Sequence, residues 1–490
     1  MPHSTKRTDR LRRKPFTARV WLACLVAAIS GLGHSAAVAD EALAEGGGWQ
    51  QAAGPLIADA RPVSNRLAQL IEHWPLPDEA ARLDRQLIVT IAADFSPPDW
   101  LPAAAASLWQ RFADLRRLRA DRFFSEAVAM LDRLAARDAP PASATEAIRL
   151  LARVLRENPA HEQARAGLGY VRHRDTWVWP NAARRLDRNQ SFSDSFGWLG
   201  PGQTPAAAVA RAQAAADDPP PLARASRFQS DHWQIRSTAD ADATAALARR
   251  LEQTRSIWLQ AFGGFAVEPG ELQQRISGRR RNRPTASFAA VLLANRQQYI
   301  GELKRLEPRI AQTLGIYWTP TRTAWFFQGD EPPVLTIEHE ATHQLFAESR
   351  RTSRLAGERC GMWALEAVAC YFESLEPTAF GFTLGGRTAG RMPAARERLL
   401  DDGFFIPLRE LCAFGRTDLQ GDPRLPQIYS QISGLADFFL NGQQGRFRDA
   451  FIEYLRLIYQ AEARPDTLWR LCNCSPEAID EDYRRHLTRP

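Results

Sequence analysis

Two histidines four positions apart, His339 and His343, constrain this chain more than any other feature of its 490 residues. They lie in the segment His339-Glu340-Ala341-Thr342-His343, which matches the pattern H-E-x-x-H. Residues four apart on a helix share one face, so the two imidazoles can bind one cation, and neutral imidazole suits zinc. Glu340 would lie beside the pair, where a carboxylate can take a proton from a water molecule held by the metal. The alternative is a helix that carries two histidines with no joint role.

The residues around this motif predict a mostly buried helix over residues 334–346. Apolar side chains recur there at helical spacing, at Val334, Leu335, Ile337, Ala341, Leu345 and Phe346. Asp330 and Glu331 suit the N-terminus of such a helix, and Pro332-Pro333 suits its first turn.

A catalytic zinc ion held by two histidines and a water molecule needs one more protein ligand. The sequence offers Glu366, the one carboxylate in the apolar stretch from Trp363 to Phe372. A buried carboxylate is costly unless it is paired or binds metal. We therefore expect Glu366 to be the third ligand, with an arginine partner as the alternative. Glu373 has two readings of equal weight, either orienting a ligand histidine or marking the exposed end of the helix.

H-E-x-x-H followed about twenty residues later by Trp363-Ala-Leu-Glu366-Ala-Val-Ala-Cys-Tyr-Phe372 resembles the gluzincin metallopeptidases of clan MA. The closest resemblance is to secreted bacterial peptidase-MA-like proteins whose N-terminal regions are helical and TPR-like. It implies His339, His343 and Glu366 as zinc ligands and Glu340 as the general base. Ala367 stands where the family often has glycine. No G-x-M-E-N motif is present, so aminopeptidase activity is not expected.

The resemblance implies an α+β fold, in which an α-helical, TPR-like region precedes a gluzincin-like domain with a small mixed sheet and an H-E-x-x-H helix. We expect a helical domain over residues 40–199, a linker over 200–225, and the peptidase-like domain over 226–490. Residues 40–54 are rich in Gly and Ala and predict a loose segment. Residues 145–159 and 160–170 resemble one TPR hairpin, and residues 120–137 contain a degenerate one.

The second half of the chain predicts strands first and the motif helix afterwards. We expect strands at 232–238, 286–293, 316–318 and 323–327, and helices at 240–265, 295–306 and throughout 400–490. In the family a sheet edge lies along the substrate cleft, which would let an extended peptide pair with it. Tyr429 lies in a segment that resembles the helix after the third ligand, so it is a candidate oxyanion donor, the alternative being an ordinary half-buried tyrosine.

Residues 1–39 read as a signal peptide with cleavage before Asp40, which predicts a periplasmic or secreted protein. Seven basic side chains against one acidic side chain lie within this segment, so most of the net charge of +7 belongs to it. We therefore expect no nucleic-acid partner and no stable membrane insertion after cleavage. The alternative is an uncleaved anchor. Five cysteines remain after cleavage, and their pairing is left open, buried thiols being the simpler reading.

Together these patterns predict an exported zinc metallopeptidase that hydrolyses peptide bonds in a peptide or protein substrate. Zn²⁺ would be held by His339, His343 and Glu366, with Glu340 and Tyr429 as catalytic residues. The alternatives are a helical scaffold with a vestigial peptidase-like domain and another zinc hydrolase such as an amidase.

Overall fold

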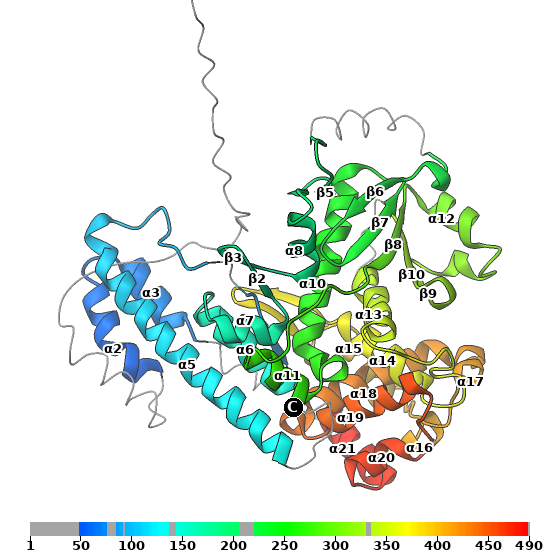
Figure 1. Cartoon of the computed structure of the whole chain (residues 1–490). Coiled ribbons are helices and arrows are strands. Elements are labelled where there is room, and N and C mark those ends of the chain that lie inside the picture. Colours follow the sequence, from blue (N-terminus) through cyan, green and yellow to red (C-terminus); the bar gives the residue numbers. More distant parts are fainter. Residues whose placement is uncertain are drawn as a thin grey trace, which may run out of the picture. The chain divides into compact units, whose positions relative to one another are not determined.

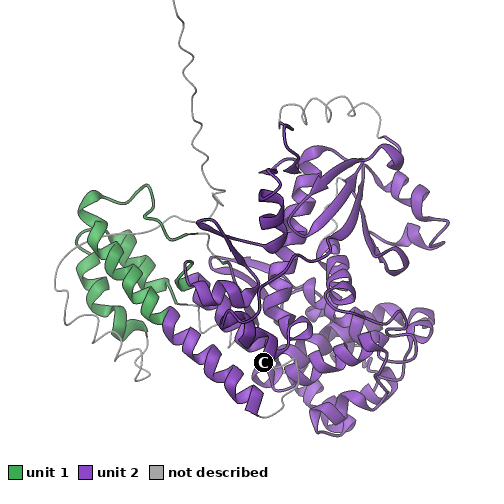
Figure 2. Ribbon diagram, viewed as in Figure 1, with its two compact units in different colours: residues 1–76, 91–119, 157–159 green, residues 77–90, 120–156, 160–490 purple. Residues whose placement is uncertain are grey.

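The computed structural model describes residues 49–75, 85–91, 94–136, 144–204, 220–329 and 335–488, and shows a mixture of helices and sheet (Figure 1). The chain is therefore α+β, as expected. It divides into two compact units, residues 1–76, 91–119 and 157–159 in unit 1, and residues 77–90, 120–156 and 160–490 in unit 2 (Figure 2). The boundaries of these units differ from the domain boundaries expected near residues 199 and 226.

Unit 1 is built from helices. Its elements are α2 (Trp49–Ala60), α3 (Asn65–His73), η1 (Ala103–Ala105) and the first half of α5 (Ala106–Ala136). The loose segment expected over 40–54 is wrong for its described part, because α2 begins at Trp49. The indole of Trp49 donates a hydrogen bond to the Ile71 carbonyl and is buried against Phe112. Glycine and alanine suggested a loop, but the tertiary position of Trp49 decides the conformation.

The first helices of unit 2 include the helix pair for which a TPR-like hairpin was predicted. They are the second half of α5, α6 (Ala144–Glu157), α7 (Glu162–Leu168) and α8 (Pro180–Leu186), with the hairpin β2 (Val171–His173) and β3 (Thr176–Val178) between the last two. Gly167 of α7 lies directly against Leu151 of α6 and Ile276, so the expected helix pair is present. The degenerate repeat is wrong, because residues 120–136 belong to the single continuous helix α5.

The described part of unit 2 contains a seven-stranded mixed sheet. Its order is β4 (Ser191–Ser193), β5 (Gly197–Leu199), β6 (Ser226–Gln229), β7 (Trp233–Ser237), β8 (Phe288–Leu293), β10 (Thr323–Phe327) and β9 (Ile316–Trp318). The pairs β5–β6, β7–β8 and β8–β10 are parallel, and the other neighbours are antiparallel. Strand β9 is consequently one edge of the sheet.

Four strands of this sheet and the helices between them confirm the predicted positions within a few residues. The predicted helices are α10 (Ala241–Ala266) and α12 (Arg296–Leu303), whereas α11 (Pro269–Ile276) was not predicted. The short turns are η3 (Leu222–Arg224), η4 (Ile310–Gln312) and η5 (Thr319–Thr321). The expected linker falls partly outside the described residues, at 205–219. Strand β5 pairs with β6, and Gly197 approaches the Gln229 backbone too closely for any side chain.

The C-terminal half of unit 2 is helical, as predicted for residues 400–490. It contains α13 (Thr336–Glu348), α14 (Met362–Phe372), α15 (Met392–Leu400), α16 (Leu408–Leu411), α17 (Arg416–Gly421), α18 (Leu425–Gly445), α19 (Arg448–Gln460), α20 (Thr467–Cys472) and α21 (Pro476–Thr488). A small antiparallel sheet, β1 (Gln86–Val89), β12 (Gly381–Leu384) and β11 (Glu376–Thr378), joins them. Helix α14 packs on α13 and on α18, and α13 packs on α10 and on strands β9 and β10.

The segments that carry the export prediction, residues 1–39 and the cleavage site before Asp40, lie outside the described residues. Among the helices that are described, none has both the length and the apolar character needed to cross a membrane. Cys360, Cys370, Cys412, Cys472 and Cys474 are all free, and the first three are buried, in agreement with the reading of the cysteines as thiols.

Candidate metal centre

Helix α13 presents His339 and His343 on one face, with ring centroids 5.0 Å apart. The helix begins at Thr336, because Leu335 has a left-handed backbone conformation with a φ of 60°. The prediction that it begins at residue 334 or earlier is therefore wrong at its N-terminus, and residues 330–334 lie outside the described residues. A left-handed backbone conformation is uncommon for leucine, and the local sequence does not predict it.

Helix α14 supplies the carboxylate. All eleven of its residues are buried, as the apolar sequence around Glu366 predicted. The helix follows Gly361, whose φ of 74° and close contact with Tyr454 and Ile458 favour glycine. Glu366 is only 8% exposed, so its carboxylate must find partners inside the protein.

The three predicted ligands converge on one point. The carboxylate Oε2 of Glu366 lies 3.8 Å from His339 Nε2 and 3.6 Å from His343 Nε2. The three ligand atoms all lie within 4.8 Å of one another. Donors around one tetrahedral zinc ion at about 2.0–2.2 Å are separated by about 3.3–3.6 Å. Two imidazoles and one carboxylate with this spacing therefore fit a zinc ion with one position left for water or substrate.

Glu373 orients one of these histidines. Its Oε1 lies 2.9 Å from His339 Nδ1, and its side chain is 16% exposed. A carboxylate at this position favours the tautomer with the proton on Nδ1, which leaves the Nε2 lone pair facing Glu366. Of the two readings of Glu373, the structure places it as the partner of a candidate ligand, although it does cap the end of α14.

The hydroxyl of Tyr429, on α18, donates a hydrogen bond of 2.9 Å to Glu366 Oε2. That oxygen is the same one that faces both histidines. Among the described residues, Tyr429 and the two histidines are the polar partners of Glu366, so the arginine considered as an alternative partner is not there. Tyr429 thus lies at the site, where it holds the candidate ligand.

The charges of the metal-free cluster reinforce one another. Burial works against the charged form of Glu366, but His343 and His339 outweigh it and hold the pKa of Glu366 well below its usual range. Burial also disfavours an imidazolium at His339, yet hydrogen bonds with Cys370, Glu366 and Glu373 raise the pKa of His339 well above its usual value. A metal ion would replace the proton that these groups share, so metal binding should release protons.

Glu340 faces the edge of the large sheet. Its Oε2 accepts a hydrogen bond of 2.7 Å from the backbone N–H of Tyr317 in β9. Because this N–H bonds to Glu340 on α13, it points towards α13 and is not used in the pairing with β10. The contact fixes the carboxylate predicted as general base between the motif helix and the edge expected to receive a peptide.

Two further side chains at the centre were not identified from the sequence. Arg391 donates from Nε to Glu373 Oε2 at 2.5 Å and from Nη2 to Glu373 Oε1 at 2.9 Å. Cys370 lies within 4.8 Å of donor atoms of His339 and Glu373. The spacing of Glu366, Cys370 and Glu373, four and then three residues apart, places them on one face of α14 and was the available signal for the thiol. No sequence signal pointed to Arg391, because it precedes a different helix.

Comparison of the chain with protein-family models, with curated proteins and with solved structures finds no match in any of the three. The gluzincin resemblance therefore rests on the motif residues and their geometry.

Proposed function

We propose that this chain is an exported zinc-dependent metallopeptidase of gluzincin type that hydrolyses peptide bonds. One observation carries the proposal, namely that His339 Nε2 and His343 Nε2 both face Glu366 Oε2, at 3.8 and 3.6 Å, beside Glu340 on the same helix. Two imidazoles and one carboxylate are the ligands of many catalytic zinc sites. A structural zinc site would more commonly have four protein ligands.

The residues around the ligands have separate roles in this proposal. A zinc ion held by His339, His343 and Glu366 would polarise the scissile carbonyl and acidify a water molecule beside it. Glu340 would take the proton of that water molecule and pass it to the leaving amine. Its hydrogen bond to Tyr317 N keeps the carboxylate oriented before any substrate arrives. Tyr429 would support Glu366 and, when substrate binds, offer its O–H to the developing oxyanion.

Strand β9 supports a peptide as the substrate class. It is an edge of the sheet, and α13 packs directly against it. An extended peptide can add to such an edge through backbone hydrogen bonds, without any particular side chain. The Tyr317 N–H on this edge is bound to Glu340. A peptide lying there would bring its backbone next to Glu340.

The test compares the wild-type protein with Glu340→Gln on a mixed peptide library, with zinc analysis of both. Gln keeps the size of the side chain and removes the base, while the three ligands are untouched. We expect the variant to keep its fold and its zinc and to lose about 10² to 10⁴ in rate. Glu302→Gln, which neutralises an exposed carboxylate on α12, is the matched control and should cleave like wild type.

Equal cleavage by wild type and Glu340→Gln would contradict the mechanism and point to a contaminating protease. Zinc-loaded wild type that cleaves no member of the library would count against a peptidase and favour the scaffold alternative.

A further inference from the structure

His339 lies between two sets of metal-ligating atoms. Its Nε2 faces His343 and Glu366, which form the candidate metal centre. Its Nδ1 faces a second set, the thiol of Cys370 and the carboxylate of Glu373, and these three donor atoms also lie within 4.8 Å of one another. Imidazole, thiolate and carboxylate are all good ligands for zinc and for cobalt. The chain thus offers two places for a metal ion on one imidazole.

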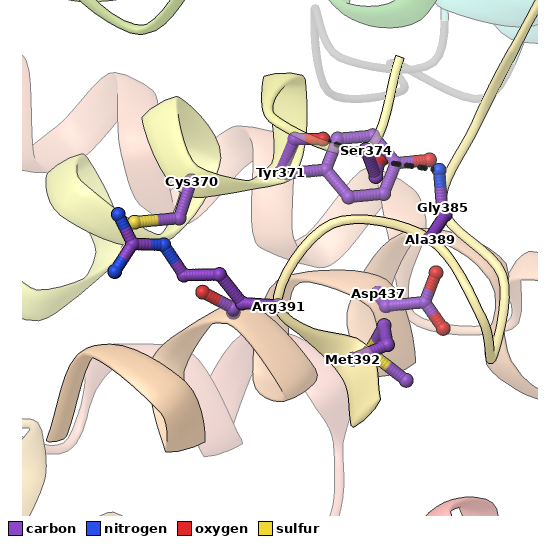
Figure 3. A pocket seen from close by; sticks show the side chains of 9 residues that line it. Cys370, Tyr371, Ser374, Gly385, Ala389, Arg391, Met392 and Asp437 are labelled. Atoms are coloured by element: carbon purple, nitrogen blue, oxygen red, sulfur yellow. Dashed lines mark hydrogen bonds between the residues drawn. The ribbon is translucent and has the colours of Figure 1, made fainter. Parts of the chain in front are cut away.

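Arg391 is bound to the second set of donors. Its guanidinium engages both oxygens of Glu373, at 2.5 and 2.9 Å, and Oε1 is the oxygen that also accepts from His339 Nδ1. Figure 3 shows the same guanidinium beside the sulfur of Cys370. The positive charge of Arg391 and the thiol act on each other, so the two groups are close. The guanidinium therefore lies beside the carboxylate and the thiol that would have to bind a cation in the second set.

An arginine is suited to occupy a position beside metal-ligating atoms permanently. The guanidinium stays charged at every pH that a folded protein experiences, and its fork matches the two oxygens of a carboxylate. The ring of Tyr429 lies 5.6 Å from the guanidinium carbon and gives it a second support. A small pocket borders Cys370 and Arg391, which leaves room beside the thiol once the arginine is shortened (Figure 3).

We propose that Arg391 acts as a fixed cation that excludes a metal ion from the second donor set, formed by His339 Nδ1, Cys370 and Glu373, and so limits the site to one metal ion. This inference rests on the proposed metal centre. A metal ion at Nδ1 would displace the proton from Nδ1. The imidazole of His339 would then either turn away from Glu366 or bridge two metal ions through its two ring nitrogens. Exclusion by Arg391 keeps His339 Nε2 free for the ion that the proposed function needs.

The simpler view is that Arg391 forms an ordinary surface ion pair, since 41% of its side chain is exposed. Exposed ion pairs contribute little to stability, typically below about 1 kcal/mol. That view predicts that removing Arg391 changes neither the number of metal ions nor their ligands. The two views therefore predict different metal spectra and different numbers of bound metal ions for Arg391 variants. A purely structural role would leave both unchanged.

The experiment titrates metal-free full-length protein with Co²⁺ and records the near-ultraviolet and visible spectrum. Thiolate bound to cobalt gives a charge-transfer band that imidazole and carboxylate ligands do not give. The wild type should bind one Co²⁺ per chain without this band. Arg391→Gln should show the band, either because it binds a second Co²⁺ or because its single Co²⁺ binds at the second donor set instead of the first. Arg391→Lys keeps a cation and should resemble the wild type.

Two further variants keep the result unambiguous. The double variant Arg391→Gln with Cys370→Ser should lose the band, which excludes the other five cysteines of the chain as its source. Arg391→Met, apolar and of similar length, replaces Arg391→Gln if circular dichroism shows that the latter is unfolded.

An Arg391→Gln spectrum and stoichiometry identical to wild type would overturn the inference while leaving the metal centre intact. A thiolate band in the wild type would overturn it as well. A wild type that binds no Co²⁺, together with a thiolate band in Arg391→Gln, would contradict the proposed metal centre and leave only the exclusion of metal from the second donor set standing. If neither protein binds Co²⁺, both are contradicted.

Discussion

The imidazole of His339 uses both of its ring nitrogens, and most of the candidate site depends on this. Nε2 faces Glu366, while Nδ1 is held by Glu373, which Arg391 holds in turn. The sequence predicted the inner residues because four-residue spacing and a lone carboxylate are local signals. It did not predict Arg391, because its contact with Glu373 joins the start of α15 to the end of α14 and no local pattern encodes it.

Tyr429 carries a prediction at this scale. Tyr429→Phe removes the hydrogen bond to Glu366 Oε2 and leaves the ring in place. Loss of a residue that orients a metal ligand typically costs about 10- to 100-fold in metal affinity. We expect a loss of this size in zinc affinity, measured by competition with a chelator, and a lower kcat. Tyr459→Phe is the control, since Tyr459 is buried nearby and donates to none of the three ligands.

A zinc affinity for Tyr429→Phe equal to that of Tyr459→Phe would show that the hydroxyl does not support Glu366. A lower kcat with unchanged zinc affinity would instead assign Tyr429 to the oxyanion alone.

At the scale of elements, periodic and alternating apolar residues located α10, α14 and strands β7, β8, β9 and β10 closely. The same patterns could not show which strands pair. The pairing of β5 with β6 joins segments separated by the region expected to be a linker, and it depends on Gly197 passing within contact distance of Gln229. Nor could they show that α13 starts after a left-handed Leu335.

Hydrogen bonds to one carboxylate connect the turn between β6 and β7 to α10. Glu252 accepts hydrogen bonds of 2.7 Å from Ser230 Oγ, His232 N and His232 Nδ1. Burial opposes its charge, but His232 and these hydrogen bonds lower the pKa of Glu252 from 4.5 to about 2. A carboxylate with a lowered pKa stabilises the fold above its unfolded pKa, and that contribution is lost as the pH falls through the folded pKa.

Glu252→Gln should therefore destabilise the protein at pH 7 by up to about 3 kcal/mol, and by less than half of that at pH 3. Urea unfolding of both proteins at the two pH values measures the difference, with Glu302→Gln as an exposed control. A difference in unfolding free energy that is the same at both pH values would contradict the lowered pKa.

At the scale of the whole molecule, the family resemblance and the order of the predicted strands and helices implied the α+β class. They also predicted that the motif helix follows the strands of the sheet. The TPR-like reading of the first half stays a prediction, and its degenerate repeat is wrong, because a repeat signature does not reveal that α5 continues unbroken through residues 120–136. The order of strands in the sheet, with β9 at the edge beside α13, comes from long-range contacts that only the folded chain displays.

The central claim is that His339, His343 and Glu366 bind one zinc ion, and the zinc content of purified protein tests it most directly. After dialysis against metal-free buffer, wild type should retain one zinc ion per chain. His343→Ala, which removes one of the three ligands, should retain almost none and keep its fold by circular dichroism. A wild type without zinc, or His343→Ala with undiminished zinc, would contradict the account.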